Sequence, residues 1–155
     1  MNILPFDKFS LNEFVHPYND LLLYHGTAQE FESFDEAKTY GGIHLGTRAQ
    51  AVMRSSKYLL ECQVRFLKAV RYKDAVSGWN DKIKAAKRKG AEGIVYLNRY
   101  EGIPTERVVM LHDKCRAEEL DTMPDSKFAK LVPEAEDSYI IFDPKQIIIL
   151  NRFSS

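Results

Sequence analysis

The sequence predicts one α+β domain, on the evidence of its length and of the order of its secondary-structure signals. Its 155 residues suit a single domain, and 45% apolar with 28% charged residues is ordinary for a globular protein. Segments with strand features outnumber those with helical features, and the helices fall early in the chain. We expect residues 1–20 to form an extension that packs on a domain of residues 21–155.

The first third of this domain predicts two short strands, a helix and a longer strand. The apolar run 21–25 ends at a glycine and predicts a buried strand. A Gly-Gly turn then leads into the brief strand Ile43–Leu45. Thr47 can cap a helix that extends to about Leu60, and the imperfect alternation of residues 63–72 predicts a further strand.

The middle of the chain predicts a helix followed by a buried strand. Asn80 or Asp81 can cap a helix that ends at Gly90, so that a capping residue stands at each end. The basic run 82–89 is expected to be a solvent-facing side of this helix, and a nucleic-acid patch is the alternative. The apolar residues 93–98 predict the strand.

The last third begins with a long polar segment. Residues 99–136 are punctuated by prolines and predict an inserted loop before the final strands, with a strand at 107–112 and a short helix around 126–131. Two strands follow, 139–142, which an Asp-Pro pair closes, and 147–150.

Charge and cysteine content disfavour several classes of function. Lysine plus arginine and aspartate plus glutamate both total 22, so the net charge is zero and nucleic acid is an unlikely partner. Cys62 and Cys115 form no Cys-x-x-Cys pair, which disfavours a zinc ribbon or a disulfide scaffold. Asp7, Glu13 and Pro17 interrupt any signal-peptide core, and no apolar run is long enough to span a bilayer. We therefore expect a cytoplasmic protein without a membrane partner.

Two histidines beside glycines could contact a ligand. His25 ends a strand next to Gly26, which places an imidazole and an open backbone at one point. In the second stretch Ile43 and Leu45 face one side of a strand, so His44 faces the other. Ordinary strand and turn histidines are the alternative interpretation. Neither histidine has a carboxylate or thiol at metal-ligand spacing, so no metal site is predicted.

Acidic residues precede the strand 139–142. They are Glu134, Glu136 and Asp137. A carboxylate at a strand entrance could stabilise a sugar cation, as in glycoside chemistry. Solvated loop acids are the alternative.

Taken in order, these segments resemble the ADP-ribosyltransferase fold in its His-Tyr-Glu branch, typified by diphtheria toxin and the poly(ADP-ribose) polymerases. The residues that carry the resemblance are His25-Gly26-Thr27, Gly42-Ile43-His44-Leu45, and Ser138-Tyr139-Ile140-Ile141-Phe142-Asp143 with Gln146-Ile147. The chain looks still closer to the transferase domains of phage polyvalent proteins and related bacterial effectors, which have a similar Gly-Ile-His-Phe-Gly-Thr and Asp-Ser-Tyr-Ile-Val-Phe-Asp-Pro-x-Gln-Ile. The resemblance covers roughly residues 21–150.

The resemblance implies a split pair of small antiparallel β-sheets with flanking helices. It also implies NAD+ as a co-substrate, bound between the sheets without a metal. His25 would hydrogen-bond the adenine-side ribose, and the Gly26 backbone would hold the nicotinamide carboxamide, with Thr27 beside it.

Aromatic contacts to the cofactor are implied as well. His44 occupies the position of the family's strand tyrosine, which packs against the cofactor. Tyr40 and Tyr58 are both candidates for the residue that stacks on nicotinamide.

The family's catalytic glutamate is replaced here. Ser138 stands in its place, and a neutral serine supplies no charge to stabilise a ribosyl cation. With His44 and Ser138, Asp137 is expected to complete the catalytic group if a bulge turns it inward, against the alternation of a regular strand. Glu101 and Glu136 are further candidates for the missing carboxylate.

The function that the resemblance implies is transfer of ADP-ribose from NAD+ to a macromolecule such as a host protein. The phage and bacterial likeness suggests an effector that acts on a host system such as a defence factor, in the host cytoplasm. A catalytically degenerate binding or inhibitor protein and an NAD+ glycohydrolase are the alternatives.

Overall fold

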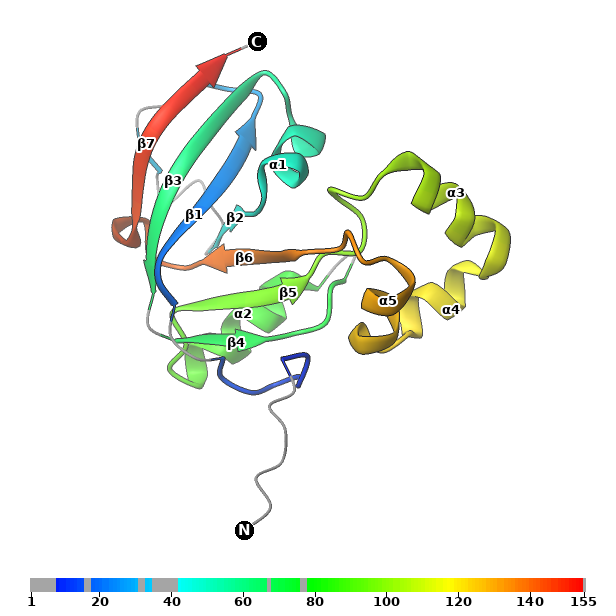
Figure 1. Ribbon diagram of the computed structural model, residues 1–155. Coiled ribbons are helices and arrows are strands. Elements are labelled where there is room, and N and C mark those ends of the chain that lie inside the picture. The colour runs from blue at the N-terminus through cyan, green and yellow to red at the C-terminus, as the bar shows by residue number, and fades with distance from the viewer. Residues whose placement is uncertain are drawn as a thin grey trace.

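The computed structural model describes residues 8–15, 18–30, 33–34, 42–66, 68–75 and 78–154, and it has the predicted α+β architecture (Figure 1). The strands of this part are β1 Tyr18–Thr27, β2 Ile43–Leu45, β3 Tyr58–Phe66, β4 Ala69–Arg71, β5 Gly93–Leu97, β6 Asp137–Ile141 and β7 Ile147–Ser154. The helices are α1 Arg48–Arg54, α2 Trp79–Arg88, α3 Thr105–Lys114, α4 Ala117–Thr122 and α5 Asp125–Leu131, with a short 3₁₀ helix, η2, at Pro144–Gln146.

The strands form two small sheets. The order is β1-β3-β7 in the first sheet and β2-β6-β5-β4 in the second. Neighbouring strands are antiparallel except β4 and β5, which run parallel because helix α2 connects them. The second sheet is therefore mixed rather than purely antiparallel. The two sheets meet where Tyr24 and Gly46 exchange backbone hydrogen bonds of 2.7 and 3.0 Å.

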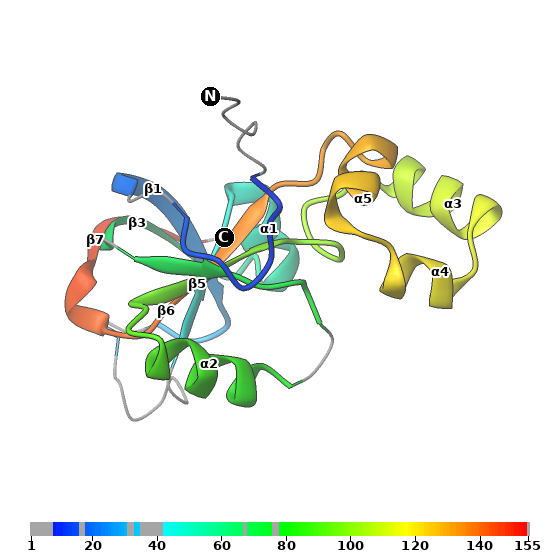
Figure 2. The same cartoon turned by 90° about the horizontal axis from the view of Figure 1, so that it is seen from below.

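Each face of the four-stranded sheet has its own hydrophobic cluster. Ile43 and Leu45 of β2 are buried between the two sheets, with the inner residues of β3 and β6. The opposite face packs on α2, which contributes Ile83 to the second cluster (Figure 2). His44 lies on this second face, between two residues that point into the first cluster. The alternation predicted for this strand is confirmed.

Residues 105–131 form three helices, where the sequence predicted a loop with a strand at 107–112. That strand was wrong, because α3 occupies the segment and buries one face only. Leu111 is buried in a third hydrophobic cluster, whereas Val109 on the same helix stays exposed. The helix predicted around 126–131 is confirmed as α5.

A buried arginine ties these helices to the sheet. The Arg99 guanidinium donates to the Leu120 carbonyl at 2.5 Å, to the Met123 carbonyl, and to the Asp125 carboxylate at 2.7 Å. It also lies 4.9 Å from the centre of the Phe128 ring. Since Arg99 lies two residues after the end of β5, α4 and α5 are fixed relative to the end of that strand.

The structure also corrects the predicted ends of several elements. α1 ends at Arg54 rather than Leu60, because the next residues turn into β3, the central strand of its sheet. The strand predicted over residues 63–72 is divided between the end of β3 and the whole of β4. α2 begins at Trp79, directly after Gly78, whose φ of +88° suits glycine.

The N-terminal segment lies along the edge of the four-stranded sheet. Asn12 and Val15 donate backbone hydrogen bonds to the carbonyls of Arg71 and Ala69, at 2.8 and 2.9 Å. The Arg71 amide donates in return to Glu13 at 3.0 Å. These bonds satisfy backbone groups on the outer edge of β4.

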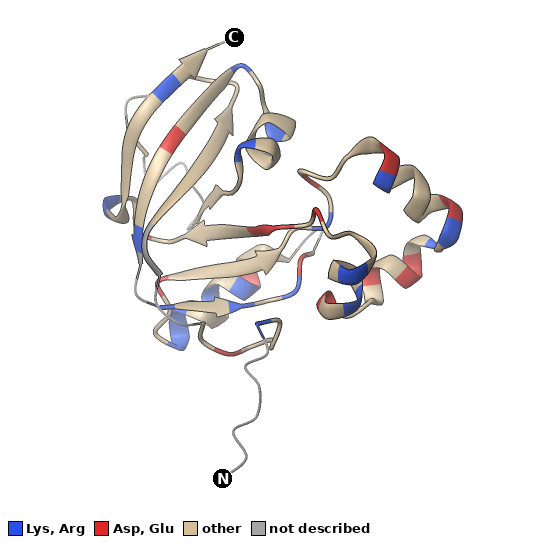
Figure 3. Ribbon diagram, in the orientation of Figure 1, with Lys and Arg blue, Asp and Glu red and all other residues tan. Residues whose placement is uncertain are grey.

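Charges of both signs are spread over the surface (Figure 3). Lysines, an arginine and Asp81 lie along α2. α3 and α5 carry acidic and basic residues together, whereas the charged residues within α4 are all acidic. None of the helices among the described residues is both long and apolar enough to cross a membrane.

Candidate functional site

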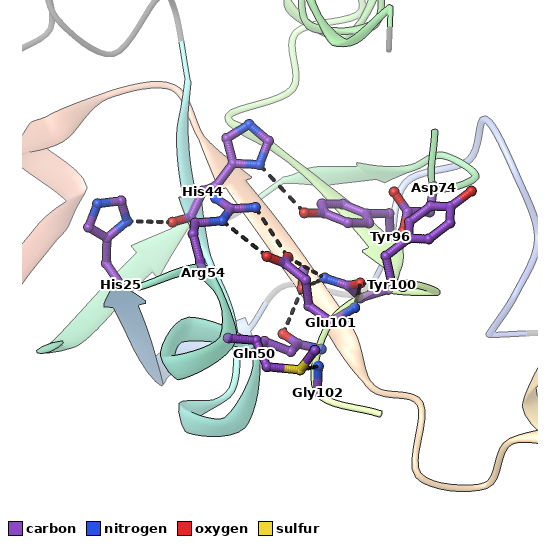
Figure 4. A network of polar contacts seen from close by, with 12 residues as sticks. His25, His44, Gln50, Arg54, Asp74, Tyr96, Tyr100, Glu101 and Gly102 are labelled. Atoms are coloured by element: carbon purple, nitrogen blue, oxygen red, sulfur yellow. Dashed lines mark hydrogen bonds and ion pairs between the residues drawn. The ribbon is translucent and has the colours of Figure 1, made fainter. Parts of the chain in front are cut away.

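A small cleft lies where α1, β2 and β6 approach one another, and its polar residues form a connected network (Figure 4). Its lining includes Gly26, His44, Gln50, Arg54, Glu101 and Ser138. These residues come from five separate stretches of the chain. The open volume is about 10 Å³, which is room for about one water molecule.

Gly26 brings β1 directly against α1. A Cβ atom on this residue would lie 2.0 Å from the Ala51 carbonyl oxygen and 2.6 Å from that of Ser55. Both contacts are with backbone, so neither is relieved by a change of rotamer. A glycine is therefore required for β1 to form this wall of the cleft.

The two predicted histidines are in contact. His25 donates from Nδ1 to the His44 carbonyl at 2.7 Å, a bond that links the two sheets. His44 Nδ1 lies 3.5 Å from the Tyr96 hydroxyl. Burial, with the charge of Arg54, lowers the pKa of His44 to about 4, and burial also lowers the pKa of His25. His44 is therefore neutral at pH 7.

Ser138 is a buried link between three elements. Its hydroxyl donates to Gln50 Oε1 at 2.6 Å and accepts from Asn98 Nδ2 at 2.9 Å. Gln50 forms a capping box with Thr47 and donates from Nε2 to the Glu136 carbonyl at 3.0 Å. Ser138 thus joins α1 to the ends of β5 and β6.

Glu101 is the carboxylate that reaches the cleft. It accepts from Asn98 Nδ2 at 3.0 Å and from Arg54 Nη2 and Nε at 3.2 and 3.3 Å. The Arg54 side chain is 38% exposed and that of Glu101 is 23% exposed, so solvent reaches this pair. The Arg54–Glu101 pair lies across the opening between α1 and the loop after β5 (Figure 4).

The structure places Asp137 outside the cleft. Ser138 pairs with Tyr96 and Asp137 with Leu97 in an unbroken register, so no bulge turns Asp137 toward Ser138. Its carboxylate instead accepts two hydrogen bonds from Arg71 on the opposite face. Glu136 is also apart from the cleft, since only its carbonyl joins the network.

Thr27 and Tyr58 are paired with each other at the end of the three-stranded sheet. The Thr27 hydroxyl closes a turn by donating to the Gln29 carbonyl at 3.1 Å. Tyr58 lines a separate pocket of about 430 Å³, which Lys57 and Phe153 also line. Neither residue lines the cleft that holds His44. Tyr40 falls outside the described residues.

Asp74 lies close to this network, beside Tyr96 and Tyr100 (Figure 4). It accepts the backbone amide of Arg99 at 2.9 Å. Burial raises its pKa to about 6, although hydrogen bonds from the backbone oppose the rise. A carboxyl with a pKa near 6 can exchange a proton near neutral pH.

Sequence reasoning did not single out Gln50, Arg54 or Asn98 as site residues. Two of them carried a usable signal. Gln50 stands three residues after Thr47, which is the spacing of a capping box, and Arg54 lies one turn further along the same helix face. Asn98 bonds mainly to the residues just after it, but no local pattern encodes its bond to Ser138 of β6.

Among the described residues, no three or more His, Cys, Asp or Glu side chains are grouped to hold a metal ion. No known protein-family model matches the sequence, and no curated protein matches it either.

Proposed function

We propose that this protein is an NAD+-dependent ADP-ribosyltransferase in which Glu101 supplies the carboxylate that the sequence lacks at Ser138. The observation that carries the proposal is the position of Glu101 in the same cleft as Gly26 and His44. The acceptor is proposed to be a macromolecule, with a host protein as the expected class.

The proposed reaction exchanges one bond at the ribose carbon C1′. The bond from C1′ to the nicotinamide nitrogen breaks, and its electron pair leaves with neutral nicotinamide. An acceptor nucleophile then forms a new bond to C1′ and releases its proton to solvent or to a nearby base. A carboxylate near C1′ stabilises the positive charge that develops on the ribose.

The charges of the cleft are consistent with this chemistry. Glu101 contributes the negative partner that the ribosyl cation needs. His44 is uncharged at pH 7, because burial holds its pKa at about 4, and so it adds no positive charge beside that cation. A flat, neutral imidazole can also pack against a nicotinamide or ribose ring.

The cleft must open before it can hold these groups. An open volume of about 10 Å³ excludes a nicotinamide ring while Arg54 spans the cleft to Glu101. Exposed ion pairs of this kind contribute only about 0–1 kcal/mol, so a ligand can displace Arg54 at small cost. An anionic diphosphate would also attract the released guanidinium.

The same small volume favours a second candidate function, a binding or inhibitor protein that has this fold and no turnover. In that case the Arg54–Glu101 pair would be a permanent part of the surface. Calorimetry with NAD+ distinguishes the two functions, because the second predicts no binding in the cleft.

The transferase is tested by incubating the protein with NAD+ and host lysate. Released nicotinamide is measured by chromatography, and added ADP-ribose by mass spectrometry. We expect Glu101→Gln to lower turnover by about 10²–10³, with a change of less than about tenfold in NAD+ affinity. Glu136→Gln is the matched control, because its side chain is exposed and outside the network.

Three outcomes distinguish the functions. Loss of activity in Glu101→Gln but not in Glu136→Gln supports the proposal. Release of free ADP-ribose with no modified acceptor indicates an NAD+ glycohydrolase that uses the same carboxylate. A folded parent protein that neither binds nor cleaves NAD+ contradicts both and supports the binding protein.

A further inference from the structure

Asn98 has a buried side-chain amide that bonds to the loop carrying Glu101 and to Ser138 of β6. It is 2% exposed and directly follows β5. Its Oδ1 accepts the backbone amides of Tyr100 at 3.0 Å and Glu101 at 2.8 Å. Its Nδ2 donates to Glu101 Oε1 at 3.0 Å and to Ser138 Oγ at 2.9 Å.

One side chain therefore fixes both the backbone and the carboxylate of Glu101. The two bonds to Oδ1 shape the turn after β5, as asparagine does in side-chain-capped turns. The bond from Nδ2 then sets the direction of the Glu101 carboxylate within that turn. A residue such as serine or alanine at this position would not make all of these bonds.

The support behind Asn98 is continuous with α1. Ser138 accepts from Asn98 and donates to Gln50, whose own side chain closes the α1 capping box. Gly102, just after Glu101, lets this loop pack closely on Gln50 of α1, because a Cβ atom on Gly102 would lie 2.7 Å from Gln50 Cγ. The position of the carboxylate is thus set by packed, buried groups of α1 and β6.

The second partner of Glu101 differs in kind from Asn98. Arg54 is solvent-accessible and its ion pair can exchange with a ligand. The Asn98 amide has no such freedom, since its other hydrogen bonds would be lost with any movement. When Arg54 leaves, Asn98 remains to hold the carboxylate in place.

We infer that Asn98 is the positioning residue for Glu101, and that Ser138 anchors Asn98 rather than acting on the substrate. The inference rests on the proposed function for its catalytic meaning. Its structural content, that Asn98 controls the Glu101 carboxylate, is measurable without NAD+.

The test replaces the donor by a second carboxylate. Asn98→Asp keeps the acceptor for the two backbone amides but faces Glu101 with an oxygen in place of the N–H. Two carboxylates about 3 Å apart cannot both ionise freely, so the pair should share a proton. The Glu101 side-chain signal should therefore report a titration at least about one pH unit higher than in the parent. The titration is followed by carbon-13 NMR, with the Glu101 signal assigned from Glu101→Gln.

Other charged and titratable groups face Glu101 and are the same in both proteins. They are Arg54 from α1, His44 from β2, Asp74 after β4 and Tyr96 from β5. Asn151→Asp is the matched control. Asn151 donates to Glu61 at 2.8 Å on the exposed side of β7, so this change should leave the titration of Glu101 unmoved.

An activity measurement separates positioning from a merely structural role. In Asn98→Asp the acidic limb of the pH profile of NAD+ cleavage should move up by the same amount as the NMR titration, with KM changed less than about threefold. Loss of fold alone would lower the melting temperature and leave the pH profile of the remaining active protein unchanged.

Ser138→Ala is a second variant that keeps the Asn98 amide but removes its anchor. It should lower kcat about tenfold without moving the acidic limb as far as Asn98→Asp does. The inference is overturned if Asn98→Asp folds and the Glu101 signal titrates as in the parent. If Asn98→Asp does not fold, the inference is overturned by a folded Ser138→Ala protein whose kcat is unchanged. A parent protein without NAD+ cleavage would defeat the proposed function alone, because the NMR titration would still test the positioning.

Discussion

The Asp137 carboxylate and the Arg71 guanidinium form two hydrogen bonds of 2.8 and 2.9 Å on the face of the four-stranded sheet opposite Ser138. The Arg71 side chain is only 2% exposed and that of Asp137 is 25% exposed. Asp137 and Ser138 are adjacent in sequence, yet one neutralises a buried cation while the other supports the cleft. Asp137 is therefore expected to contribute to stability rather than to chemistry.

Replacing Asp137 should destabilise the fold without removing activity. Asp137→Ala leaves a buried guanidinium without this carboxylate, which we expect to lower the free energy of unfolding by about 2–4 kcal/mol in urea denaturation. The double variant Arg71→Met with Asp137→Leu should be less destabilised than the single one, because no charge remains buried. A stable Asp137→Ala protein that has lost NAD+ turnover would contradict this assignment and return Asp137 to the active site.

Gly26 should tolerate no side chain. Gly26→Ala places a Cβ 2.0 Å from the Ala51 carbonyl oxygen, so α1 must move away from β1. We expect a loss of about 3 kcal/mol or more in the free energy of unfolding. Gly90→Ala is the comparison, since it has a φ of +83° but open space around it, and should cost only about 1 kcal/mol. Equal losses in the two variants would show that the packing of Gly26 is unimportant.

His44 should make stability depend on pH in the acidic range. Its folded pKa of about 4 lies below the usual 6.5, so the unfolded chain binds the proton first as the pH falls. The stability that neutral His44 supplies is complete above about pH 6.5 and is lost as the pH falls toward 4. We expect the parent to lose about 2–3 kcal/mol more than His44→Gln between pH 7 and pH 4.5, measured by urea denaturation. Parallel pH dependences of the two proteins would refute this.

Asp74 should make the stability of the fold decrease as the pH rises, the opposite of the effect of His44. Its folded pKa of about 6 lies above the usual 3.8, so the folded protein holds this proton more tightly. The contribution to stability is present below about pH 3.8 and is lost as the pH rises through 6. Asp74→Asn should therefore gain about 1–3 kcal/mol relative to the parent when the pH is raised from 4.5 to 7.5. The asparagine amide keeps an oxygen that can accept the hydrogen bond from the Arg99 backbone. If the difference in the free energy of unfolding between the two proteins stays constant over this pH range, the Asp74 carboxyl is not the cause of the pH dependence.

Local patterns in the sequence were sufficient to predict which side of each strand the side chains around the cleft occupy. Ile43, His44 and Leu45 alternate between the two sides of β2, and Asp137 and Ser138 alternate on β6. A period of two is a property of the extended backbone, so it can be read before any tertiary contact is known.

Other elements depended on partners far away in the chain. The apolar residues of 107–112 suit a strand or a helix, and the buried cluster around Leu111 favours the helix. Residues 58–60 lie at the end of the helix predicted after Thr47, but their backbone groups pair with β1 and β7 on both sides. Pairing on both edges outweighs a local helical tendency.

The sequence by itself determined that the chain is an α+β domain, that His25 lies on a strand beside Gly26, and that His44 faces the opposite side of its strand from Ile43 and Leu45. Only the tertiary structure decided which carboxylate enters the cleft. Glu101 lies 37 residues before Ser138 and meets it through one buried amide, while Asp137, its immediate neighbour, is turned away. The direction of a side chain on a strand is local, but a shared cleft depends on loop closure and on the packing of separate elements against one another.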